Sequence, residues 1–223
     1  MFDKEKVEEI LKGIVWLNKE MGIWALIVPA VFAAVVLFLL YSCYKNPGKK
    51  TSRLLLAVYV LIYIYSGFTI FIGKDFMGLK EALTGAVALW IVAVLLIADI
   101  IFNWTEVRLP EKAHLKIISV FFILAGIFFY PLLEIALGFV FPRMVFIGAE
   151  CPTTISLIGI FIGSIPRVNK PLFILVSLNA IFTGASVALN GAPFDYLYAA
   201  SGIFGLLMLV IYFRDIFLGK KKL

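Results

Sequence analysis

The feature that most constrains this chain is a series of seven apolar runs, each about 20 residues long. A run of that length crosses the hydrocarbon core of a bilayer as a helix, the only open-chain form that satisfies its own backbone hydrogen bonds there. The composition agrees, because 63% of the residues are hydrophobic and the mean hydropathy is +1.05. We therefore predict an all-α, polytopic transmembrane bundle of about seven helices, with spans at roughly 22–44, 53–73, 82–103, 115–138, 144–165, 170–189 and 194–213.

Short polar connections join these runs, so the sequence predicts one bundle with no separate soluble domain. We expect residues 1–20 to form an amphipathic interfacial helix, 21–215 the seven-helix transmembrane domain and 216–223 a basic cytoplasmic tail. The apolar residues of the first segment recur at helical spacing, at Val7, Ile10, Leu11, Ile14 and Leu17. Such a helix serves either as an interfacial anchor or as a lid over an outward-facing cavity.

The basic residues are divided unequally between the two sets of connections. Thirteen of the 20 Lys and Arg residues lie in the segments 45–53, 108–116, 167–170 and 214–222. With seven spans, these four segments all lie on the same side of the membrane. Because cytoplasmic loops retain Lys and Arg, we predict a multi-pass protein of the cell membrane with its N-terminus outside. The net charge of +6 then indicates contact with membrane lipids and no nucleic-acid partner.

The cysteine and histidine counts limit the chemistry. Cys43 and Cys151 are predicted near opposite ends of different spans, so we expect no disulfide between them. Two distant thiols and one histidine make no metal site, and we expect no cofactor. His114 falls in a predicted cytoplasmic loop, which disfavours a Ser-His-Asp hydrolase. Glutamine is absent, which weakly favours a thermophilic source.

When the sequence is aligned with itself at an offset of 117 residues, the second and third runs align with the sixth and seventh without a gap. This alignment gives seven identities over 37 positions, among them Gly67 on Gly184 and Gly85 on Gly202. One interpretation is an internal repeat of three spans, a linker span and three spans. Coincidence among apolar helices of similar composition is the other.

The segment 130–159 brings prolines and polar residues to membrane depth together. Pro152 lies about eight residues into the fifth run, where it removes a backbone donor and clashes with the preceding turn. Thr153 and Thr154 offer hydroxyls to the backbone groups left unpaired. We therefore predict a separate helix over 152–165, with its positive N-terminal end facing a polar pocket. An ordinary proline kink is the alternative.

Seven residues form the predicted ligand-binding site: Glu134, Arg143, Glu150, Cys151, Thr153, Thr154 and Asn179. Glu134 is expected near the outer interface, where it either pairs with Arg143 or is solvated. Asn179 lies in the middle of the sixth run, where an interhelical hydrogen bond is the alternative to a ligand contact. The helix end and Arg143 favour an anion, whereas the two glutamates favour a proton or cation. Both signs of charge remain open.

Several short motifs are shared with a known family. They are Tyr130-Pro131-Leu132-Leu133, Leu137-Gly138, Pro142-Arg143, Phe146 and Cys151-Pro152-Thr153-Thr154-Ile155, with Asn18 and Trp24 as looser matches. In these residues the chain resembles an uncharacterised prokaryotic family of small multi-spanning membrane proteins, known only as a domain of unknown function. Glu150 stands where the family pattern has a proline. The resemblance implies a multi-spanning fold and a role for 130–159, but no activity.

Three functions remain open. The first is a membrane transporter or channel-like protein that binds a small solute or ion near the broken helix. The second is a sensor or structural subunit that transports nothing, and the third is a thiol enzyme using Cys151. Transport requires a water-reachable cavity ending at 134–154, whereas a structural role predicts a dry, packed bundle. Gly159 and Gly163 are spaced for close helix contact, within the bundle or across a homo-oligomer.

Overall fold

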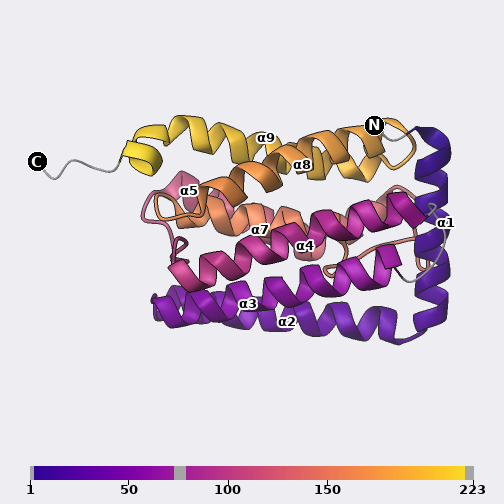
Figure 1. The fold of residues 1–223 in the computed structure, drawn as a ribbon, viewed down its shortest axis with the longest axis horizontal. Coiled ribbons are helices and arrows are strands. Elements are labelled where there is room, and N and C mark those ends of the chain that lie inside the picture. The colour runs from indigo at the N-terminus through magenta and orange to yellow at the C-terminus, as the bar shows by residue number, and fades with distance from the viewer. Residues whose placement is uncertain (1–2, 73–78, 219–223) are drawn as a thin grey trace, which may run out of the picture.

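The computed structural model describes residues 3–72 and 79–218, without the side chains of 70–82. The helices lie along one direction in a bundle, and α1 lies across one end of it (Figure 1). The elements are α1 (Lys4–Met21), α2 (Trp24–Lys45), α3 (Lys49–Ser66), η1 (Gly67–Ile72), α4 (Leu79–Phe102), α5 (Ala113–Leu124), η2 (Ala125–Phe129), α6 (Tyr130–Ala136), α7 (Glu150–Ser164), α8 (Lys170–Leu189), η3 (Pro193–Asp195), α9 (Tyr196–Ile211) and η4 (Arg214–Leu218). The predicted all-α fold is confirmed.

Within the described residues, six helices are long and apolar enough to cross a membrane. They are Trp24–Lys45, Lys49–Thr69, Leu83–Phe102, Ala113–Ala136, Lys170–Leu189 and Pro193–Ile211. The remaining predicted span, the fifth at 144–165, corresponds to α7, a shorter apolar helix of 15 residues. The sequence therefore located every helix of the bundle, and one of them is too short to cross about 30 Å of hydrocarbon on its own.

The predicted start of the fifth span at residue 144 is wrong. The chain between α6 and α7 follows an irregular path, in which Gly138 and Gly148 have φ angles of 85° and 113°. Glycine adopts these left-handed conformations without the steric cost that other residues bear. The helix restarts at Glu150, two residues before the predicted boundary at 152, and ends at Ser164. We call residues 137–149 the entry loop.

The helix α1 is held at the α7 N-terminal end of the bundle. Its first turn is capped by Asp3, whose carboxylate accepts a hydrogen bond from the Lys6 backbone amide at 2.9 Å. It ends at Gly22, where φ is 55°. The last described element, η4, lies at the opposite end of the bundle from α1 (Figure 1). Which end faces the cytoplasm stays a prediction, and residues 1–2 and 219–223 lie outside the described part.

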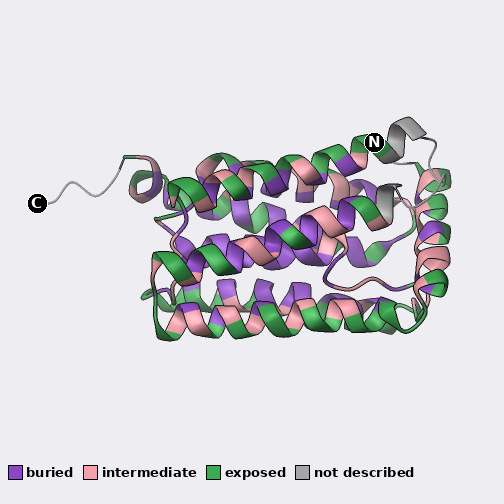
Figure 2. Cartoon of the chain, turned by 60° about the horizontal axis from the view of Figure 1, so that its bottom comes forward, coloured by how far each residue is buried: buried purple, intermediate pink, exposed green. Residues whose placement is uncertain are grey.

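The core is centred on α7, in which every residue from Pro152 to Ser164 is buried. Buried residues gather on the inner faces of the surrounding helices and exposed ones on the outer faces (Figure 2). A Cβ atom on Gly159 would lie 2.7 Å from the Ile123 backbone nitrogen, and one on Gly163 would lie 2.5 Å from Ser119 Oγ. The glycine pair therefore allows α7 to pack against α5 inside the bundle.

The order of elements agrees with three spans, a linker and three spans, with α3 packed on α4 and α8 packed on α9. Gly67 packs against Trp90 in the first pair, and Gly184 packs against Ala199 in the second. These contacts do not test whether the two pairs superpose. The internal repeat stays a prediction.

Candidate functional site

The N-terminal end of α7 lies at membrane depth among α8 and α9. Glu150, the first residue of α7, accepts a hydrogen bond at 2.7 Å from the side-chain amide of Asn179, the tenth of the 20 residues of α8. Asn179 Nδ2 also lies 3.0 Å from the Tyr198 hydroxyl, which donates to Glu150 at 3.4 Å. The Thr183 hydroxyl donates to the side-chain oxygen Oδ1 of Asn179 at 3.2 Å. A carboxyl group therefore lies beside the middle of a membrane-spanning helix.

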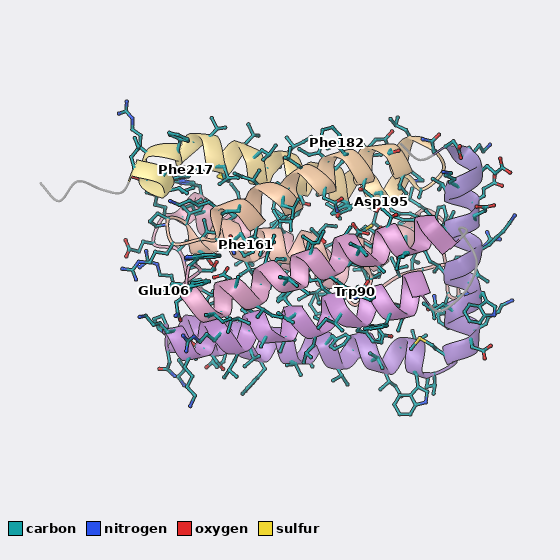
Figure 3. All side chains as sticks on the ribbon, viewed as in Figure 1. Trp90, Glu106, Phe161, Phe182, Asp195 and Phe217 are labelled. Atoms are coloured by element: carbon teal, nitrogen blue, oxygen red, sulfur yellow. The ribbon has the colours of Figure 1, made fainter. Side chains whose placement is uncertain are left out.

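A second acid, Asp195, lies beside the first turn of α7. It is 2% exposed and accepts a hydrogen bond at 2.5 Å from the hydroxyl of Tyr130, the first residue of α6. The thiol of Cys151 lies within interaction range of the same carboxyl. Figure 3 shows Asp195 inside the bundle toward the α1 end, with Glu106 at the other end.

The third acid, Glu134, is 0% exposed and binds the entry loop. Its carboxylate accepts from the Val145 backbone amide, with Oε2 at 3.0 Å and Oε1 at 3.3 Å. Arg143 is exposed, and in the described structure no ion pair joins it to Glu134. The structure shows neither of the two alternatives for Glu134, a pair with Arg143 or solvation. Glu134 instead bonds to the backbone and satisfies one amide of a loop that has no helical partner for it.

Two other side chains hold the entry loop. Asn18 of α1 donates from Nδ2 to the carbonyl oxygens of Pro142 at 2.8 Å and Met144 at 2.9 Å. The Gly148 amide donates to the hydroxyl of Thr153 at 3.0 Å. Irregular backbone is tolerated at membrane depth where protein side chains satisfy its polar groups. The helix across the bundle end and the short central helix are therefore joined through this loop.

Tyrosines from α3 line the other side of α7. The hydroxyl of Tyr63 lies 2.7 Å from the Thr154 hydroxyl, and that of Tyr59 lies 2.9 Å from the Ser156 hydroxyl. Ser156 also donates to the Thr153 carbonyl at 2.8 Å. Both tyrosines are buried, so the first two turns of α7 carry a hydrogen-bonded row of hydroxyls within an apolar core.

The acid cluster, defined as Glu134, Glu150 and Asp195, has no basic counterpart. Glu134 and Glu150 are each close enough to Asp195 to interact with it electrostatically. The ion pairs of the described residues, Lys112–Asp215 and Arg167–Glu106, involve none of these three acids. A buried carboxylate without a counter-ion is costly, so the cluster is expected to hold protons or attract a cation.

A small cavity of about 40 Å³ lies next to the start of α7, between α1, α3 and the entry loop. Its polar lining comes from Asn18, Tyr65 and Thr69, together with the backbone of Gly148 and Ala149. That volume accommodates a few water molecules and no organic solute, since a water needs about 10 to 15 Å³ of such space. Among the described residues, no group of three His, Cys, Asp or Glu side chains is arranged to hold a metal ion.

The structure brings most of the predicted site residues together around the first turn of α7. Glu150 and Asn179 bond directly, and Cys151, Thr153 and Thr154 lie on the same turn with the partners described above. Arg143 is outside this group.

Asp195 and the tyrosines are not among the site residues predicted from the sequence. Asp195 follows Pro193 at the start of an apolar run, so it resembles an ordinary helix start. The spacing of four residues between Tyr59 and Tyr63 was the available signal, because it places both hydroxyls on one helix face away from the membrane interfaces.

Comparisons with known proteins give one result. The model of a family of unknown function, DUF6064, matches residues 9–219, which include all of the elements from α2 to η4. Neither the curated proteins nor the solved structures gave a match.

Proposed function

This chain belongs to the DUF6064 family of unknown function, and we propose that it is a transporter or channel-like protein for a small ion. The observation that carries the proposal is the bond between Glu150 and Asn179 beside the middle of α8. An ionisable side chain inside a membrane is expensive, and such residues commonly mark ion or substrate pathways. We place the protein in the cell membrane on the strength of its spans and basic connections.

The interruption before α7 supports the same function. Many transporters bind their substrates near the bilayer midplane, at discontinuous helices whose ends project into the protein. Here α7 follows a non-helical segment and begins next to Asn179, well inside α8. The polar groups of this interruption face other helices, where the bundle shields them from lipid.

The charges favour a proton or another small cation over an anion. The acid cluster contributes three carboxyl groups, and none of them forms an ion pair within the described residues. The N-terminal dipole of α7 would attract an anion, but Glu150 already occupies the first turn and complements that dipole.

The proposal is tested with purified protein in liposomes exposed in turn to gradients of H⁺, Na⁺, K⁺ and Cl⁻. We expect flux of one of the cations above that of empty liposomes, and a lower flux for Asp195→Asn. Arg143→Gln is the control, because Arg143 is exposed and bonds to none of the acids. If none of the four gradients drives protein-dependent flux, the proposal is wrong.

A structural or sensory role is the second candidate, and the packing of α7 favours it. All residues from Pro152 to Ser164 are buried, and a Cβ atom on Gly126 would lie 2.3 Å from the Pro152 carbonyl oxygen. Transport then requires α7 or the entry loop to move. A thiol enzyme has less support, because His114 bonds to Tyr212 at the end of the bundle away from Cys151.

A further inference from the structure

A groove of about 370 Å³ separates α2 from the η2–α6 segment. Its walls are Leu26, Pro29, Ala30 and Ala33 on α2 and Ile127, Phe128, Pro131, Leu132 and Ile135 on η2 and α6, and the entry loop closes it with Met144, Phe146 and Ile147. Every one of these side chains is apolar. We call this space the α2–α6 groove.

The groove exists because α2 is loosely attached to the rest of the bundle. Its main contacts are with α3 and α1. Only 17% of its most apolar stretch is buried, compared with 33% to 50% for the other five spans. Across from it, Leu132 and Ile135 of α6 are also exposed. Two membrane-spanning helices therefore face each other without touching closely.

We propose that the α2–α6 groove binds one acyl chain of a membrane lipid. The groove lies between two membrane-spanning helices, so its surroundings are hydrocarbon, and its lining offers no hydrogen bond to a polar guest. From Leu26 to Ala33 it extends about 10 Å along α2, at roughly 1.5 Å per residue. That is less than the depth of one leaflet, about half of a 30 Å core.

The other apolar occupant available in a membrane is a helix from a second copy of the chain, which is about 10 Å across. A single hydrocarbon chain is slimmer and more flexible, so it enters a space between two helices of one copy more readily. The test below distinguishes the two occupants.

The entry loop joins the groove to the site at α7. Met144 and Ile147 line the groove, while Val145 between them donates its amide to Glu134. Met144 and Ile147 are already buried by the protein, so the acyl chain is not needed to cover them.

The test uses full-length protein purified in a mild detergent and supplied with a phospholipid that carries a diazirine on its acyl chain. After illumination, we expect crosslinks concentrated in peptides containing residues 26–33 and 127–135 at low lipid-to-protein ratio. Ala33→Trp fills the groove and should abolish them. Ala88→Trp is the matched control, because Ala88 is an exposed alanine on the outer face of α4, and it should leave the crosslinks unchanged.

Native mass spectrometry provides the second measurement. Wild type and Ala88→Trp should retain one bound phospholipid, and Ala33→Trp should lose it while keeping the helical circular dichroism of wild type. Should Ala33→Trp not fold, Ala30→Leu takes its place with the same expected loss. Three results would overturn the proposal. They are crosslinks spread evenly over the exposed helices, lipid retained by folded Ala33→Trp or Ala30→Leu, and a dimer without bound lipid.

Discussion

The side-chain amide of Asn179 donates a 2.7 Å hydrogen bond to the carboxylate of Glu150. The two residues are 29 positions apart in the sequence and belong to different helices. Their bond links the first residue of the short central helix to the middle of a membrane-spanning one. An acid at membrane depth is held in place by this bond, and the proposed ion pathway depends on it.

Removal of the amide should weaken the fold. In Asn179→Ala, Glu150 and the Tyr198 hydroxyl lose their shared partner, and we expect the free energy of unfolding to fall by about 1 to 2 kcal/mol. Thermal unfolding in detergent measures the change. Leu178→Ala is the control, because the neighbouring Leu178 is exposed on the outer surface of α8. Equal melting temperatures for Asn179→Ala and wild type would show that the bond contributes nothing.

Small residues are required where α7 packs against α5. A methyl group at Gly159 would lie 2.7 Å from the Ile123 backbone nitrogen and 2.9 Å from the Ser119 carbonyl oxygen. Neither backbone atom can move away easily, so Gly159→Ala should destabilise the protein by about 1 to 3 kcal/mol, measured by thermal unfolding in detergent. Gly48→Ala is the control, since its φ is −179° and no atom lies within 4 Å of the added methyl group. Equal losses in the two variants would contradict the packing requirement.

The connection between α1 and the entry loop depends on Asn18. Asn18→Ala removes the two hydrogen bonds that the side-chain amide donates to the carbonyl oxygens of Pro142 and Met144. Their loss should loosen the loop. We expect faster hydrogen–deuterium exchange in 137–149, with little change in α8. Asn46→Ala, at an exposed position beyond the end of α2, should leave exchange in the loop as it is in wild type. If exchange in the loop of Asn18→Ala also equals that of wild type, the side chain of Asn18 on α1 does not restrain the loop.

The orientation predicted from the basic residues can be tested with introduced cysteines. Native Cys43 is 0% exposed and therefore a poor probe from either side. Lys12→Cys on α1 and Glu111→Cys between α4 and α5 lie at opposite ends of the bundle. On intact cells, an impermeant maleimide should label the first above the wild-type background and label the second only after permeabilisation. The reverse pattern would invert the topology.

The sequence was sufficient for the architecture because apolar length and basic residues report directly on a membrane environment. It also located the restart of the helix near Pro152, since a proline within an apolar run breaks the helix or begins a new one. It placed the start of the fifth span too early. Hydropathy does not distinguish a lipid-facing helix from an irregular loop that other parts of the protein bury, and Val145 to Gly148 are apolar in either case.

The partners within the site were harder to predict. Asp195 and Tyr130 are 65 residues apart, and their hydrogen bond depends on how η3 packs against α6. No local pattern encodes that packing. A pair of Glu134 with Arg143, one of the two alternatives expected, does not form for a related reason, because a backbone amide of the entry loop binds the carboxylate. Charge complementarity alone is a weak guide where unpaired amides are present.

The central claim is that Glu150 lies on an ion pathway, and the most direct test compares Glu150→Gln with Glu106→Gln in liposomes. Glu106 is an acid paired with Arg167 at the opposite end of the bundle, so its variant controls for the loss of one carboxylate. With a cation gradient that drives flux through wild type, we predict a large loss for Glu150→Gln and a wild-type rate for Glu106→Gln. A wild-type rate for folded Glu150→Gln would contradict the claim.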